Sequence, residues 1–102
     1  LDCRVLETRV IRTQKLLDVL DKYLETGQPI HLLSVDVEGL DHQVLLSNDW
    51  AKYRPGIVLV EEWGAPLSAF KFPTAVFSLL NSNGYELLAK TFNTSFYRLR
   101  SA

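Results

Sequence analysis

The sequence lacks the features that define several common protein classes. It contains no methionine and only one cysteine, Cys3, among 102 residues. One thiol can close no internal disulfide and make no zinc site alone, which excludes disulfide scaffolds and indicates a reducing or indifferent compartment; we expect the cytoplasm as the location. No apolar run approaches the roughly 20 residues that cross a bilayer. No signal peptide is visible, so we expect no membrane association.

An excess of charge of one sign is also missing. Eleven Lys and Arg residues stand against twelve Asp and Glu residues, for a formal net charge of −1. A phosphate backbone needs a basic surface, so we expect no nucleic-acid partner. Because the chain opens at Leu1 and has no methionine, we expect it to be a fragment, a single partial domain over residues 1–102.

The residues that are present predict a small folded α/β domain. Apolar residues make up 47% of the chain and charged residues 23%, which is typical of a soluble globular domain. Hydrophobic spacing and turn residues predict the elements in order. The first three are a short outer strand over 5–11, a helix that has Thr13 as its cap and ends before Gly27, and a strand over 30–37. A helix from Leu40 toward Trp50, a strand over 57–60, a helix over 74–81 and a hairpin of 85–90 with 95–100 follow.

This order predicts a layered sheet with parallel strands first and an antiparallel hairpin last. The run IHLLSVDV at 30–37 is nearly continuous in apolar residues, so we expect a strand that is buried on both faces. Ligands of parallel α/β sheets bind beyond the carboxyl ends of the strands. Those ends are therefore the first place to look for chemistry.

Both predicted parallel strands end in carboxylates. Asp36 and Glu38 close the first, where a period of two would place them on one face beside Ser34, and Glu61 and Glu62 close the second. If the strands are neighbours, these groups gather at one edge. There they could take a proton from a substrate hydroxyl or bind a hard divalent cation.

A structural interpretation of these residues stays open beside the functional one. Asp36 or Glu38 could simply cap the helix that follows. His42 is close enough in sequence to reach the carboxylates, although a helical histidine is more often a surface residue. Trp63 could form the wall of a site for an aromatic or sugar substrate, or could merely pack. Neither interpretation of Trp63 prevails.

The segment LLSVDVEGLDHQVL resembles the FkbM family of S-adenosylmethionine-dependent methyltransferases. Members carry a hydrophobic strand that ends in Asp-Val-Glu-Gly, then an acidic residue, then Val-Leu in a helix; the matching residues here are Asp36, Val37, Glu38, Gly39, Asp41, Val44 and Leu45. The resemblance continues through RPGIVLVEE, LLNSNGYELL and NTSFYRL. It covers the chain from about residue 10 onward.

The resemblance implies the C-terminal half of a class I, Rossmann-like methyltransferase sheet, namely its fourth to seventh strands. It implies S-adenosylmethionine as cofactor in the complete protein. The glycine-rich loop that holds the methionine part has no counterpart here, because none of the five glycines forms a G-x-G pair; they are Gly27, Gly39, Gly56, Gly64 and Gly84. We therefore expect the isolated chain to be inactive.

The resulting hypothesis is a portion of an O-methyltransferase that acts on a hydroxyl of a small molecule or sugar. Asp36, Glu38 and Glu61 are the candidate catalytic residues, and Asp36 and Glu38 are candidate ligands of a divalent metal. The same acidic residues would also suit a metal-dependent hydrolase, and a non-catalytic interaction module is a third alternative. With half of the sheet missing, the edge of the 30–37 strand would be exposed, and we expect a homodimer through that edge.

Overall fold

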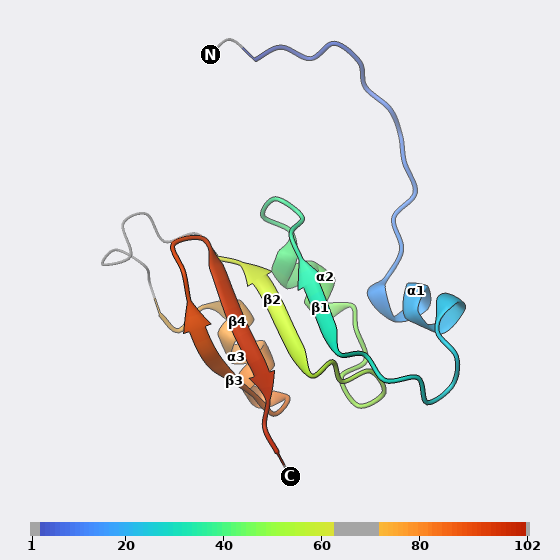
Figure 1. Ribbon diagram of the computed structural model, residues 1–102. Helices are drawn as coiled ribbons and strands as arrows, with labels where there is room; N and C mark the ends of the chain where they lie inside the picture. Colours follow the sequence, from blue (N-terminus) through green and yellow to red (C-terminus); the bar gives the residue numbers. More distant parts are fainter. Residues whose placement is uncertain (1–2, 63–71, 102) are drawn as a thin grey trace.

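A four-stranded mixed sheet organises the chain, with the strand order β1-β2-β4-β3 (Figure 1). The structure, a computed structural model, describes residues 3–62 and 72–101. The elements of this part are α1 (Leu16–Tyr23), β1 (Leu32–Val35), α2 (Asp41–Leu46), β2 (Ile57–Glu61), α3 (Ala75–Ser82), β3 (Tyr85–Lys90) and β4 (Thr94–Leu99). Within these described ranges, no helix has the length and apolar character needed to span a bilayer.

Strand directions confirm the predicted change from parallel to antiparallel pairing. β1 runs parallel to β2, whereas β4 is antiparallel to both β2 and β3. The hairpin therefore inserts its second strand next to β2 and leaves β3 at the edge of the sheet. The β3–β4 register shifts between Leu87 and Ala89, so Leu88 forms a bulge on this edge strand.

The core lies between the sheet and helices α2 and α3, which cover the same face of the sheet in Figure 1. Its most buried side chains come from five elements: Leu45, Val58, Val60, Leu80, Tyr85 and Tyr97. Trp50 closes the core beside Tyr85, with the ring centroids 5.5 Å apart in an edge-to-face arrangement. The Tyr85 hydroxyl donates to the Pro55 carbonyl at 2.5 Å, which satisfies its buried polar group.

The prediction that the first long strand is buried on both faces is wrong. β1 is only four residues long, and of its side chains only that of Val35 is buried, whereas Leu32 is 55% exposed. The reason is positional: β1 has β2 as its only strand neighbour within the described residues, and its second face lies away from α2 and α3. β1 therefore has the apolar composition of a central strand but is an edge strand of the described sheet.

The N-terminal predictions need two corrections. No strand forms over residues 5–11, which are exposed and extended, and in Figure 1 they run away from the sheet. Thr13 caps no helix, because α1 begins at Leu16. Ser47, at the end of α2, instead accepts the first amides of α1: the Leu16 N–H donates to its Oγ at 2.8 Å and the Leu17 N–H to its carbonyl at 3.2 Å.

Candidate active site at the carboxyl edge of the sheet

Parallel pairing brings the carboxyl ends of β1 and β2 side by side, as predicted. Asp36 follows β1 directly, Glu38 lies two residues further on, and Glu61 ends β2. Each of the three can place one carboxylate oxygen within 4.8 Å of the oxygens of the other two. Asp36 and Glu38 are exposed and Glu61 is half-buried. We call these three residues the acidic cluster.

A tight turn, and not strand periodicity, places Glu38 in the acidic cluster. β1 ends at Val35, and the Leu40 N–H donates to the Val37 carbonyl at 3.3 Å to close a turn over 37–40. Glu38 and Gly39 at its centre have φ of 50° and 91°, a combination typical of a type I′ turn. The left-handed region costs a glutamate about 1–2 kcal/mol relative to its ordinary conformations, whereas glycine adopts it freely.

Asp41, the first residue of α2, holds this turn. Its side chain is buried, and its Oδ1 accepts the Val37 N–H at 2.7 Å. Val37 lies between the two cluster residues of the loop, so this bond fixes the backbone that carries both of them. The sequence suggested that Asp36 or Glu38 caps α2, but no side chain caps this helix, and the Val37 N–H of the loop instead donates to Asp41.

A small pocket of about 240 Å³ lies beside the acidic cluster. It is lined by the ends of β1 and β2, including Asp36 and Glu61, and by Asn93 and Thr94 of the β3–β4 turn. The sequence reasoning missed the last two. The signal for them is topological: a hairpin whose second strand is antiparallel to β2 must start where β2 ends, and Thr94 is indeed paired with Glu61.

Glu62 does not join the acidic cluster, contrary to the expectation that all strand-end carboxylates gather. Successive residues of a strand point to opposite faces. Glu62 is accordingly only 8% exposed and accepts the Tyr97 hydroxyl at 2.5 Å. Burial, together with this bond, raises the pKa of Tyr97. The Lys90 ammonium donates to the Glu62 carbonyl, and burial lowers the pKa of Lys90.

The remaining residues singled out in the sequence lie apart from the acidic cluster. His42 is half-buried in α2 and does not belong to the group of potential metal ligands found among the described residues. Cys3 is exposed near the N-terminus. Trp63 lies outside the described residues, so the structure does not choose between a wall of the site and a packing residue.

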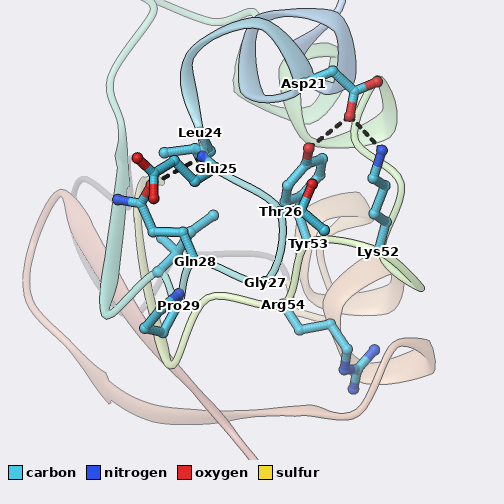
Figure 2. Close-up of a pocket in the computed structure, with 11 residues that line it drawn as sticks. Asp21, Leu24, Glu25, Thr26, Gly27, Gln28, Pro29, Lys52, Tyr53 and Arg54 are labelled. Atoms are coloured by element: carbon cyan, nitrogen blue, oxygen red, sulfur yellow. Dashed lines mark hydrogen bonds and ion pairs between the residues drawn. The ribbon is translucent and has the colours of Figure 1, made fainter.

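A larger pocket, of about 450 Å³, opens at the other end of the parallel strands (Figure 2). Asp21 and Leu24 of the α1 region, the loop over 25–30 and residues 52–54 line it. On one side, the Lys52 ammonium and the Tyr53 hydroxyl both donate to Oδ1 of Asp21, each at 2.6 Å. Figure 2 shows the two groups converging on this carboxylate, while the Arg54 side chain extends away from it.

These contacts shift the protonation equilibria of the three groups. The bond from Lys52, followed by that from Tyr53, lowers the pKa of Asp21. The same carboxylate raises the pKa of Lys52 and of Tyr53 by accepting their hydrogen bonds. All three side chains reach solvent. The contacts of Asp21 with Lys52 and Tyr53 connect α1 to the segment that follows α2, and because they are exposed they contribute little to stability.

The described residues form a mixed α/β sheet with a pocket and three neighbouring carboxylates beyond its parallel strands, the edge at which open α/β sheets commonly bind ligands. The model of the methyltransferase FkbM domain matches residues 4–87. The chain therefore belongs to the FkbM methyltransferase family, as its DVEG segment predicted. Neither a curated protein nor a solved structure matches the chain.

Proposed function

We propose that this chain forms the C-terminal part of an S-adenosylmethionine-dependent O-methyltransferase with a class I sheet, which acts on a hydroxyl of a small molecule or sugar. The acidic cluster supports this most directly, because it lies at the carboxyl edge of parallel strands in a chain of the methyltransferase family. The lone exposed Cys3 suits a reducing compartment, which favours the cytoplasm as its location.

The residues of this chain do not fit the methionine part of the cofactor. A G-x-G pair is absent from the sequence, so the loop that would hold that part must come from elsewhere in the complete domain. Two observations are compatible with such a domain. Among the described strands β1 has an open edge at which a further parallel strand could add, and the sheet face opposite α2 and α3 carries the exposed side chain of Leu32.

The acidic cluster would act on the acceptor and not on the methyl donor. When a hydroxyl oxygen forms its bond to a methyl carbon, the hydroxyl proton must leave, and a carboxylate within hydrogen-bond reach can accept it. Asp36 lines the 240 Å³ pocket together with Glu61 and is the first candidate for this base. Thr94 and Asn93 also line this pocket and provide a hydroxyl and an amide that could orient the acceptor.

The test is transfer of a labelled methyl group to an acceptor by the complete domain. Asp36→Asn is nearly isosteric and removes only the charge, so we expect loss of transfer with an unchanged fold. Asp18→Asn is a matched control, since Asp18 is exposed on α1 and lies outside both pockets. Full activity of Asp36→Asn would remove Asp36 from the reaction.

A divalent cation is a second proposal for the same carboxylates. Three oxygens that can approach within 4.8 Å of one another suit Mg²⁺ or Mn²⁺, and Asp36 and Glu38 would be the first ligands. A cation that binds only the folded chain raises its melting temperature by mass action. We expect Mn²⁺ to raise it and Glu38→Gln to reduce that rise; an unchanged melting curve would favour the metal-free base and weaken the hydrolase alternative.

A further inference from the structure

The pocket of Figure 2 has no part in the proposed transfer. It is bounded by residues that precede β1 and β2, so it lies at the opposite end of these strands from the acidic cluster. Its volume of about 450 Å³ falls within the range of small-molecule sites. A separate ligand must therefore be considered for it.

The charges that line this pocket cancel. Asp21 and Glu25 contribute two carboxylates, and Lys52 and Arg54 contribute two cations. Both cations already serve acceptors of the protein: Lys52 binds Asp21, and the Arg54 guanidinium donates to the carbonyls of Trp50 and Asn83 at 2.7 and 2.8 Å. An anionic ligand would compete with these bonds, so the lining favours a neutral one.

The remaining lining is amphipathic. Leu24, Ile30 and Tyr53 are half-buried and provide apolar surface, while Thr26 and Gln28 are exposed and polar. The Gln28 side-chain oxygen accepts the Glu25 N–H at 3.1 Å, which orients an amide that carries two N–H donors. Apolar surface, an aromatic ring and neutral donors and acceptors together match a ligand with C–H faces and hydroxyl edges.

We propose that this pocket binds a neutral saccharide ring. The C–H face of the sugar would pack on the surface that includes Tyr53, and its hydroxyls would bond to Thr26, Gln28 and the free lone pairs of the pocket carboxylates. This site is distinct from the acidic cluster, and a sugar bound in it is not the group that is methylated there. The pocket would bind one sugar unit of a glycan or glycoside, and the methylated hydroxyl would belong to another unit of the same molecule.

The experiment is an NMR titration of the ¹⁵N-labelled 102-residue chain with the neutral methyl glycosides of glucose, galactose, mannose and N-acetylglucosamine. We expect saturable shifts of amides in residues 24–30 and 52–54 for at least one of them. Glucuronate and glucosamine, which carry one charge each, should bind more weakly. Shifts confined to Asp36, Glu38 and Glu61 would instead indicate the acceptor site of the proposed transfer and would overturn this assignment.

Two pairs of variants test the lining. Tyr53→Leu should abolish the saturable shifts, whereas Tyr53→Phe, which retains the ring, should preserve them; Tyr23→Leu is the control at an exposed tyrosine outside the pocket. Gln28→Glu keeps the side-chain size but adds a charge and should weaken binding. Gln43→Glu is its control on α2.

Three results would overturn the proposal. The first is the absence of saturable shifts with every neutral glycoside. The second is binding that is unchanged in Gln28→Glu and, if it folds, in Tyr53→Leu. The third is tighter binding of glucuronate than of the neutral sugars, which would show that the two cations are available to an anion. Because Gln28 is exposed and lies in a loop, its variant keeps the test valid even if Tyr53→Leu does not fold.

Discussion

Acidic residues that are adjacent in the sequence have different structural roles at the carboxyl edge of the sheet. Asp36, Glu38 and Glu61 lie close together, the Asp41 side chain accepts a backbone N–H, and the buried Glu62 side chain accepts the Tyr97 hydroxyl. Neither the residue type, Asp or Glu, nor the position in the sequence distinguishes these roles. The difference lies in where each carboxylate finds its hydrogen-bond donors.

Asp41→Ala should destabilise the chain by about 1.5–3 kcal/mol, the usual worth of a hydrogen bond to a charged group. The variant leaves the Val37 N–H without the acceptor that now lies 2.7 Å away and releases the turn that carries Glu38. Urea unfolding measures the loss. Asp41→Asn retains an acceptor oxygen and should lose less, and equal losses for the two variants would contradict the assigned bond.

Tyr97→Phe should also destabilise the chain, by about 1–3 kcal/mol, because the buried Glu62 carboxylate loses its donor. Thermal and urea unfolding of the variant check this value. Tyr23→Phe removes a hydroxyl from an exposed tyrosine and should leave stability unchanged. A neutral result for Tyr97→Phe would mean that Glu62 finds another partner.

At the scale of elements, α1 is attached to the rest of the chain by few contacts. None of its side chains is buried, and its bonds to the body come from Ser47 at one end and from the Asp21 contacts with Lys52 and Tyr53 at the other. An amphipathic helix of eight residues has little stability of its own in water. Its position therefore depends on these polar contacts.

The attachment of α1 should weaken in acid. The pKa of Asp21 is lower in the folded chain than its unfolded value of about 3.9. Its contribution is therefore complete above that value and is lost as the pH falls through the folded-state pKa. We expect the amides of Val19 and Leu20 to lose protection against hydrogen exchange between pH 5 and pH 2, relative to their intrinsic rates, with the loss beginning near pH 4.

Asp21→Asn tests the cause of this loss. The variant has no charge to titrate, so the protection of α1 should change less between the two pH values than in the wild type. Asp18→Asn, at an exposed acidic position of the same helix, should behave like the wild type. Equal pH dependence in all three proteins would assign the effect to other carboxylates.

Local patterns predicted those elements whose limits are set by their own residues. Helix α3 begins within one residue of its predicted start because the Thr74 side chain accepts the Phe77 N–H, a bond encoded three residues apart. The start of α1 could not be predicted, because Ser47, far along the chain, provides its cap. The prediction for β1 is wrong for the same reason, since the burial of a strand depends on the elements packed around it and not on its own apolar residues.

The site shows the same limit. Convergence of Asp36 and Glu61 follows from two parallel strands, which the order of elements predicted. The turn at Glu38 could not be inferred, because strand periodicity assigned its direction while the chain had already left the strand. To place Asn93 and Thr94 at the site, one must know that β4 lies next to β2 in the sheet, and no local sequence pattern contains this information.

At the scale of the whole molecule, the open edge of β1 should pair with its counterpart in a second copy. LLSV carries no charge, and uncharged edges are templates for strand addition. Antiparallel pairing across a twofold axis keeps the two sheet faces aligned when Leu33 opposes Leu33 of the copy. The N-terminal segment, which could have protected this edge, forms no strand within the residues described.

Sedimentation equilibrium of the chain should therefore show a dimer. Leu32→Lys places a charge on the pairing edge and should shift the chain to a monomer. Leu88→Lys is the matched control, since Leu88 is similarly exposed on the far edge. A monomeric wild type, or a dimer insensitive to Leu32→Lys, would exclude association through β1.

The bulge at Leu88 has a consequence for how far such pairing can extend. It disrupts the regular spacing of backbone donors and acceptors on β3, where Glu86 and Lys90 add charge. Of the two edges of the described sheet, β1 is then the one suited to accept a strand. A pair of chains uses both such edges and leaves none open, so concentrated solutions should remain clear and should not form fibrils, whose growth needs a receptive edge at each end.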